Sequence, residues 1–221
     1  MLNQEFLQKE KLFLSKNNLV KINPEIGVII QEIPYASKHN FTNTQLYSHS
    51  FLYLHIDAYK NLLNAIKLAD EKGYIIKIFD CFRPFEIQAF MANNFPRFVE
   101  GGYVSHPSEG VATHVRGIAV DLTLLNKNDL TPLDMGSDFD EMSEKSHHNS
   151  PNISADAKKN RNILADIMIK SGFEIYPNEW WHYNLKIFKY INGEIVGATK
   201  RADKKYPKIM DNFSELLAIN N

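Results

Sequence analysis

The chain has 221 residues, of which 44% are apolar and 23% are charged, values typical of a folded globular protein. This length is sufficient for a substantial core, so we expect a single domain over residues 1–221. The 25 basic and 26 acidic residues leave a formal net charge of −1, which gives no electrostatic reason to expect nucleic acid or an anionic membrane as a partner.

The first 20 residues carry charges throughout and lack the apolar core and small-residue cleavage site of a signal peptide. No stretch of the sequence approaches the roughly 18 consecutive apolar residues of a transmembrane helix. The only cysteine, Cys81, cannot form an intrachain disulfide. We therefore expect a cytoplasmic protein with no membrane partner.

Residues 51–72 place apolar side chains at helical spacing, and Gly73 follows where a C-terminal cap belongs. The expected buried stripe is Leu52, Ile56, Tyr59, Leu63, Ile66 and Ala69. The short β-branched run at 74–79 then predicts a buried strand. Asp80–Arg83 predicts a turn, and Pro84 favours the start of a further helix.

Residues 118–125 alternate, with Ile118, Val120, Leu122 and Leu124 on one face and Ala119, Asp121 and Thr123 on the other. The polar residues 126–153 predict a long loop, which in a compact domain is usually functional or disordered.

Ser154 can cap a helix over about 155–170 that buries Ile163, Leu164, Ile167 and Met168 and ends at Gly172. Residues 181–188 predict a last strand. Because strands and helices do not alternate strictly, we expect the α+β class, with a small, mostly antiparallel sheet and flanking helices.

Three potential metal ligands stand out: His114, Asp121 and His182. A catalytic zinc site needs three protein ligands and one open position. Gly117 lets the chain turn between a loop histidine and a strand aspartate. Asp121 shares its strand face with small side chains only, and a metal would pair a carboxylate that is costly in an apolar strand. Taken singly, each residue also fits an ordinary structural role: a loop histidine, an ion-paired aspartate and a hydrogen-bonded core histidine.

Glu179 is the candidate general base, because a zinc hydrolase needs a carboxylate that takes a proton from water and returns it to the leaving amine. On a regular strand, Glu179 and His182 would point to opposite faces, so we expect Glu179 in the loop before the last strand, bent back toward the metal. We expect Trp180 and Trp181 in the core, where they bury the base and raise its pKa. The alternative is a turn with a solvated glutamate.

Asp80 and Arg83 follow a buried strand, where a rigid scaffold often places catalytic groups. A fixed guanidinium supplies hydrogen-bond donors to the oxyanion that forms when a peptide bond is attacked. Asp80 would hold Arg83 in place. The spacing allows equally well a structural salt bridge at the corner between the strand and the helix.

Five segments occur in an order that resembles the D-alanyl-D-alanine dipeptidases, zinc enzymes known from vancomycin resistance and peptidoglycan recycling. They are Y-A…N-F-T (35–42), FDCFRP (79–84), THVRGIAVDLTL (113–124), MGSDFDEMSEKSHH (135–148) and NEWWHY (178–183). The resemblance implies the zinc fold shared by DD-peptidases and hedgehog-type domains, and a small dipeptide as substrate.

The resemblance also implies a role for each matched residue. One Zn²⁺ per chain would be bound by His114, Asp121 and His182, with Glu179 as catalytic base and acid, Arg83 stabilising the tetrahedral intermediate, Asp80 supporting Arg83, and Asp140 holding the free amino group of the substrate. The loop at 126–153 would then form one wall of the pocket.

Two positions depart from the family's pattern: Phe82 replaces the usual tyrosine, and Ala112 stands where a serine is often found. The second departure leaves the finer substrate preference open. His147 and His148 match the family's loop, and we interpret them as structural because three ligands are already assigned.

Three alternatives remain. A carboxypeptidase or endopeptidase acting on longer peptidoglycan peptides would use the same metal site. A non-catalytic zinc-binding domain would need neither the base nor the arginine, and an α+β domain without metal would need none of these residues. The sequence leaves the oligomeric state open, as it does the choice between antibiotic resistance and recycling of wall fragments.

Overall fold

The centre of the fold is a five-stranded sheet of order β2-β4-β5-β7-β6. The computed structural model describes residues 4–24, 29–48, 50–108, 112–191, 194–198 and 206–210. The strands are β2 (Ile29–Gln31), β4 (Tyr74–Asp80), β5 (Ala119–Asn126), β6 (Phe173–Tyr176) and β7 (Glu179–Leu185). Only the β2–β4 pair is parallel, and the other neighbours in this sheet are antiparallel. The expected α+β class with a mostly antiparallel sheet is therefore confirmed.

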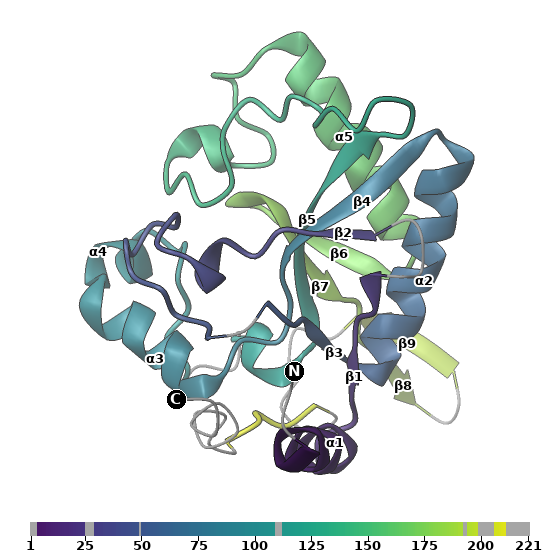
Figure 1. The fold of residues 1–221 in the computed structure, drawn as a ribbon. Helices are drawn as coiled ribbons and strands as arrows, with labels where there is room; N and C mark the ends of the chain where they lie inside the picture. Colours follow the sequence, from purple (N-terminus) through teal and green to yellow (C-terminus); the bar gives the residue numbers. More distant parts are fainter. Residues whose placement is uncertain are drawn as a thin grey trace.

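The described helices are α1 (Gln4–Lys16), α2 (Ile56–Glu71), α3 (Phe85–Asn94), α4 (Pro96–Glu100) and α5 (Ala155–Lys170), with short 3₁₀ turns η2 (Pro34–Ala36), η3 (His114–Arg116) and η4 (Glu144–Ser146). Helices α2 to α5 lie around this sheet, and α1 lies apart from it, next to β1 (Leu19–Lys21) (Figure 1). Helix α2 lies on the opposite side of the sheet from α3 and α4 in Figure 1. None of the helices within the described residues has the length and apolar character needed to span a bilayer.

Two small antiparallel pairs complete the described structure. Strand β1 (Leu19–Lys21) pairs with β3 (Tyr53–His55), and β8 (Phe188–Ile191) pairs with β9 (Glu194–Ala198). The helix expected from residue 51 therefore begins later, at Ile56, because the three residues before it form β3. His55 ends that strand and also caps α2, with its Nδ1 accepting a hydrogen bond from the Asp57 amide.

The buried stripe of α2 differs from the expected one. Ala58, Leu62, Ala65, Ile66 and Ala69 are buried, whereas Leu63 is 38% exposed. The stripe is rich in alanine, and small side chains let a helix approach its neighbours closely. Placing Leu63 in the core was wrong because the sequence pattern alone does not distinguish it from Leu62.

Helix α5 and strand β5 match their predictions closely. Ser154 caps α5 by accepting a hydrogen bond from the Ala157 amide at 3.0 Å, and Gly172 ends the helix region with φ +88°. Every residue of β5 before Asn126 is buried. The apolar face of β5 joins the core residues of β4 and α5, so the opposite face of the same strands is left for polar groups.

The long segment 126–153 is tied to α5 by one side chain. Arg161 is 1% exposed and donates hydrogen bonds to the backbone oxygens of Met135 (2.6 Å), Lys145 (2.8 Å) and His147 (2.7 Å). A charged donor that satisfies several backbone acceptors fixes a loop without regular secondary structure. The segment is thus held as one wall beside the sheet.

Candidate metal centre and catalytic site

Register irregularities in the sheet place the polar side chains of three strands in one row. Asp80 of β4 lies opposite Asp121 of β5, and Asp121 lies opposite His182 of β7. Directly opposed residues point to the same face of a sheet. The pairing of β4 with β5 shifts between Ile78 and Asp80, and this bulge turns Asp80 to the face of Asp121, although Ile78, two residues earlier, lies opposite Leu122 on the apolar face.

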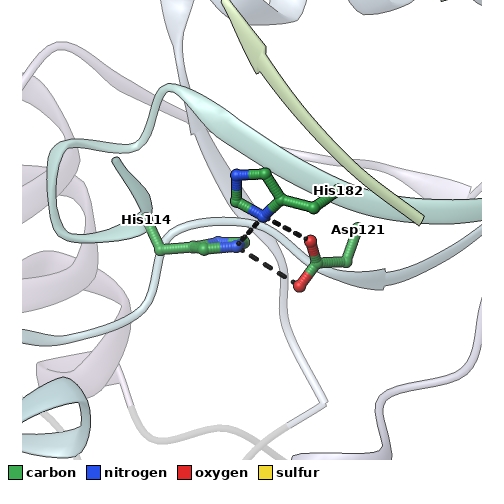
Figure 2. A group of neighbouring side chains, drawn as sticks. All are labelled: His114, Asp121 and His182. Atoms are coloured by element: carbon green, nitrogen blue, oxygen red, sulfur yellow. Dashed lines mark hydrogen bonds and ion pairs between the residues drawn. The ribbon is translucent and has the colours of Figure 1, made fainter. Parts of the chain in front are cut away.

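His114 reaches the same point from the η3 turn rather than from a strand. Gly117 follows the turn with φ +65°, and a Cβ there would lie 2.7 Å from a Leu19 side-chain atom and 3.1 Å from the His55 amide nitrogen. The expected need for glycine between the histidine and the strand is therefore confirmed. Figure 2 shows that His114, Asp121 and His182 point toward one another.

The donor atoms of the three residues fit a four-coordinate zinc ion. His114 Nε2 lies 3.1 Å from His182 Nδ1 and 3.3 Å from Asp121 Oδ2, and His182 Nδ1 lies 3.0 Å from Asp121 Oδ1. Ligands at Zn–N distances of about 2.0–2.1 Å in a tetrahedron are themselves about 3.3–3.4 Å apart. The observed separations are close to this value, with Oδ2 of Asp121 toward His114 and Oδ1 toward His182, so the three side chains are near enough to share one ion.

The other ring nitrogen of each histidine is engaged. His114 Nδ1 lies 2.5 Å from the Cys81 carbonyl oxygen, which can only accept, so this nitrogen carries the proton. His182 Nε2 lies 2.9 Å from the Asn184 amide oxygen and donates to it. Both remaining nitrogens therefore face Asp121 with a lone pair. Three acceptors that converge on one point require a cation among them, which is what a metal site provides.

The close approach of His114, Asp121 and His182 also shifts the pKa values of Asp121 and His182. Burial alone would raise the pKa of Asp121, but His114 and His182 hold that pKa well below its usual range. Burial lowers the pKa of His182, and the hydrogen bond and charge of Asp121 more than reverse this effect. Without a metal, a proton on His182 is the cation that these groups favour. Metal binding would displace that proton.

Glu179 is 7% exposed and is the first residue of β7, not part of the loop before it as expected from the sequence. The pairing of β6 with β7 is irregular, since Ile175 lies opposite Tyr183 and Tyr176 lies opposite Glu179. Because the strand is not regular there, the glutamate reaches the ligand set, with its Oε2 3.7 Å from His182 Nδ1.

Burial raises the pKa of Glu179 to about 8. Trp180 and Trp181 are 3% and 1% exposed, so their predicted place in the core is confirmed. A buried carboxylate with a raised pKa beside a metal site suits a proton acceptor near neutral pH. A divalent cation at the ligand set would lower this pKa through its charge.

Asp80 and Arg83 form a buried ion pair that is also part of the site. Arg83 donates to Asp80 Oδ2 from Nε at 2.9 Å and from Nη2 at 2.8 Å, and Tyr47 donates to the other carboxylate oxygen at 2.9 Å. Burial raises the pKa of Asp80, although the charge of Arg83 opposes this shift. Arg83 Nη2 lies 3.6 Å from Asp121 Oδ2, so the salt bridge places a guanidinium at the edge of the ligand set.

Asp140 supplies a carboxylate with one free oxygen. Its Oδ1 accepts a hydrogen bond from Tyr35 at 3.0 Å, while Oδ2 is shielded from solvent and has no hydrogen-bond partner within the described residues. Burial raises the pKa of Asp140 to about 8, and the charge of Arg83 opposes this shift. A desolvated carboxylate oxygen without a donor is a site for a cationic group of a ligand.

Most of these groups border one cavity of about 400 Å³. Its lining includes Arg83, His114, Asp121, Asp140, Glu179 and His182, together with Ala112 and Tyr103. The cavity therefore holds the candidate metal ligands, a candidate base, an arginine and the free carboxylate in one space. Ala112 is at the lining and supplies no hydroxyl there, but its neighbour Thr113 also borders the cavity.

The two adjacent histidines of the long loop lie outside the ligand set. His147 Nε2 is 3.0 Å from the Tyr103 hydroxyl, and the His148 amide donates to the Pro177 carbonyl oxygen at 2.8 Å. Among the described residues, the set of potential metal ligands is His114, Asp121 and His182 alone. These contacts agree with the structural interpretation of His147 and His148.

Sequence reasoning missed the residues that support the site. Tyr47 holds Asp80, Asn184 orients His182, Gln88 contacts Arg83, and the Cys81 carbonyl orients His114. Two of these residues lie near the residue that they support: Asn184 is two residues from His182 on the same strand, and Gln88 is on α3, five residues after Arg83. The others depend on contacts between segments 33 residues apart.

A buried His–Asp–His set with a carboxylate and an arginine on one cavity defines a metal-dependent hydrolase. The chain belongs to the D-ala-D-ala dipeptidase family, whose model matches residues 16–195. It is therefore a peptidase, and the metallopeptidase character of this family agrees with the convergent ligand set.

Individual relatives agree with this family. A D-alanyl-D-alanine dipeptidase of Escherichia coli (strain K12) is 36% identical over 168 residues, which cover 76% of this chain and 83% of that protein. A D-alanyl-D-alanine dipeptidase of Enterococcus faecium is 36% identical over 180 residues, covering 72% and 86%. A solved LD-carboxypeptidase is 18% identical, with a TM-score of 0.39 over 76% of this chain and 67% of that one, a likeness too distant to carry functional meaning.

Proposed function

We propose that this chain is a zinc-dependent dipeptidase that hydrolyses D-alanyl-D-alanine to two D-alanines. The observation that carries the proposal is the free oxygen of Asp140 in the same cavity as the His114–Asp121–His182 set. In a dipeptide with a free amino group, the ammonium is on the same residue as the carbonyl group of the peptide bond. A carboxylate beside the metal ligands suits such a substrate, and the names of the relatives indicate the same dipeptide.

Zinc is the metal that the ligands fit best. Two neutral imidazole nitrogens and one carboxylate leave a fourth tetrahedral position open, which is the usual composition of a catalytic zinc site. When bound, Zn²⁺ would lower the pKa of a water molecule and polarise the scissile carbonyl. We propose one ion per chain, held by His114 Nε2, Asp121 and His182 Nδ1.

Glu179 is the proposed base. Its Oε2 lies 3.7 Å from His182 Nδ1, so a metal held by the ligand set would bring the attacking water within reach of this carboxylate. The carboxylate accepts the proton as the water attacks, and it returns that proton to the nitrogen of the leaving D-alanine. Burial keeps the pKa of Glu179 above its ordinary value, so the protonated form needed in the second step is accessible.

Arg83 is the proposed oxyanion donor. Its guanidinium is buried at the edge of the ligand set and held by Asp80, so little reorganisation is needed when negative charge develops on the carbonyl oxygen. Asp140 would bind the substrate ammonium through Oδ2 while Tyr35 fixes Oδ1. A blocked or extended amino end would leave this carboxylate without its cation, which selects for free dipeptides.

The proposed substrate preference is tested with zinc-loaded protein and three substrates: D-Ala-D-Ala, its N-acetylated form and a muramyl pentapeptide. We expect D-alanine release from the free dipeptide alone. Release from the blocked or long substrates instead would move the chain to the carboxypeptidases. Bound zinc without hydrolysis of any of them would favour the non-catalytic zinc-binding domain.

A cytoplasmic location remains part of the proposal, and cell fractionation tests it.

A further inference from the structure

Gln88 joins the site arginine to the wall of the cavity. It lies on α3, is 3% exposed and borders the cavity itself. Its Oε1 accepts a hydrogen bond from Arg83 Nη1 at 2.9 Å, and its Nε2 donates to the Ser105 carbonyl oxygen at 2.6 Å. Neither the sequence motifs nor the proposed chemistry assigns this residue a role.

The two contacts fix the orientation of the amide. A guanidinium can only donate hydrogen bonds, and a backbone carbonyl can only accept them. A flipped amide would set donor against donor at Arg83 and acceptor against acceptor at Ser105. Glutamate would lose the donor to Ser105, and methionine would lose both contacts, so glutamine satisfies both partners where these residues of similar length do not.

Gln88 binds the one guanidinium nitrogen of Arg83 that Asp80 does not bind. Asp80 binds Nε and Nη2, whereas Gln88 binds Nη1. With both ends of the planar group fixed, the guanidinium has one orientation relative to Asp121. Because the amide is neutral, it orients Arg83 without neutralising the positive charge that an oxyanion needs.

The same amide also contacts a second part of the cavity wall. Ser105 belongs to the segment after α4 in which Tyr103, Val104 and Ser105 border the cavity. The hydrogen bond from Gln88 to the Ser105 carbonyl oxygen therefore sets the distance between this wall and Arg83. A single side chain therefore links Arg83 to the segment of the cavity wall that contains Ser105.

We propose that Gln88 is a positioning residue for the hydrolytic reaction, which orients Arg83 toward the scissile carbonyl and couples it to the Ser105 wall. This inference rests on the proposed function, because it assigns Gln88 to the reaction in which Arg83 takes part. Gln88 acts through Arg83 and does not itself contact the reacting atoms.

The first test is the variant Gln88→Met, which keeps the size of the side chain and removes both hydrogen bonds. We expect kcat for D-Ala-D-Ala to fall by about 10- to 100-fold with a much smaller change in KM, because a misplaced oxyanion donor is felt mainly in the transition state. Gln88→Glu should also lower kcat, since it adds a negative charge next to Arg83. The matched control is Met91→Leu, a buried change on the same helix, which should leave kcat within about twofold.

If Gln88 only stabilised the fold, the effect of its replacement on kcat would not depend on Arg83. A double-variant cycle therefore distinguishes a structural role of Gln88 from a positioning role. We expect Gln88→Met to have almost no effect on kcat in an Arg83→Lys background, because the group that it orients is gone. A full additional loss in that background, or wild-type kcat in Gln88→Met alone, would overturn the proposal.

A second readout does not depend on activity. In an NMR spectrum of the zinc-loaded protein, the Nη1–H signals of Arg83 should be protected from exchange with solvent in the wild type and should lose this protection in Gln88→Met, while the Nε–H held by Asp80 keeps it. Equal protection of Nη1–H in both proteins would refute the proposal. If the wild type failed to cleave the dipeptide, the proposed function would fall, and the N–H signals would still decide whether Gln88 holds Arg83.

Discussion

Replacing Asp140 by asparagine separates the recognition of the substrate's amino group from the rest of the site. Asp140 adopts φ +61°, a region that both aspartate and asparagine tolerate, so Asp140→Asn introduces no new backbone strain. The amide oxygen can still accept the Tyr35 hydrogen bond at Oδ1, while the charge at the unpartnered Oδ2 is lost. The change therefore removes the charge and little else.

The expected size of the effect follows from the lost contact. A hydrogen bond to a charged group contributes about 1.5–3 kcal/mol, which corresponds to a fall of about 10- to 150-fold in kcat/KM for the free dipeptide. The control is Asp138→Asn, an exposed position two residues earlier, which should keep wild-type kcat/KM. Initial rates of D-alanine release give both values.

The thermal stability of metal-free Asp140→Asn should not fall with its activity. Burial raises the pKa of Asp140 to about 8, so the folded metal-free protein pays for a desolvated carboxylate at high pH that asparagine does not carry. We expect the melting temperature of metal-free Asp140→Asn at pH 8 to equal or exceed that of the wild type. Unchanged kcat/KM with the free dipeptide would refute the assignment of Asp140 to the amino group.

Four further predictions follow from the site geometry. In the pH profile of kcat/KM, the apparent pKa of the acidic limb, assigned to Glu179, should lie above the ordinary glutamate value of 4.5 and, because of the metal charge, below about 8. An apparent pKa at the ordinary value would contradict the effect of burial. The variant Glu179→Ala should keep zinc but lose about 100-fold or more in kcat. Asn184→Leu should weaken zinc binding by about 10- to 100-fold in competition with a chelator, because His182 loses the acceptor that orients its ring, and unchanged affinity would contradict the ring assignment. In the metal-free protein, Glu179 and Asp140 have folded-state pKa values raised above their unfolded values, so the folded state binds more protons and the free energy of unfolding should fall between about pH 5 and 8; a rise over this range in denaturant titrations would refute the burial of these carboxylates.

The sequence predicted the candidate ligands but not the way in which the fold brings them together. His114, Asp121 and His182 stand out by residue type and by the motifs around them, and the alternation of β5 placed Asp121 opposite the apolar face. The position of Glu179 in a loop was wrong, because a regular strand was assumed where the pairing of β6 with β7 is irregular.

The supporting residues were beyond sequence reasoning for a different reason. The contact between Tyr47 and Asp80, like that between Tyr35 and Asp140, joins segments that come together only in the folded chain. Hydroxyl groups that hold carboxylates are chemically ordinary, so nothing in their local sequence indicates a role. The burial of Arg161 beneath the long loop is another example, since the three backbone oxygens that it satisfies carry no side-chain signature.

The most direct test of a metal-dependent dipeptidase is D-alanine release from D-Ala-D-Ala, measured on the purified protein before chelation, after complete chelation, and after titration with Zn²⁺ while the bound metal is quantified. We predict that activity disappears with the metal and returns in proportion to zinc, reaching its maximum at one ion per chain. Full activity in protein shown to be metal-free, or no activity with one zinc bound per chain, would contradict the proposed function.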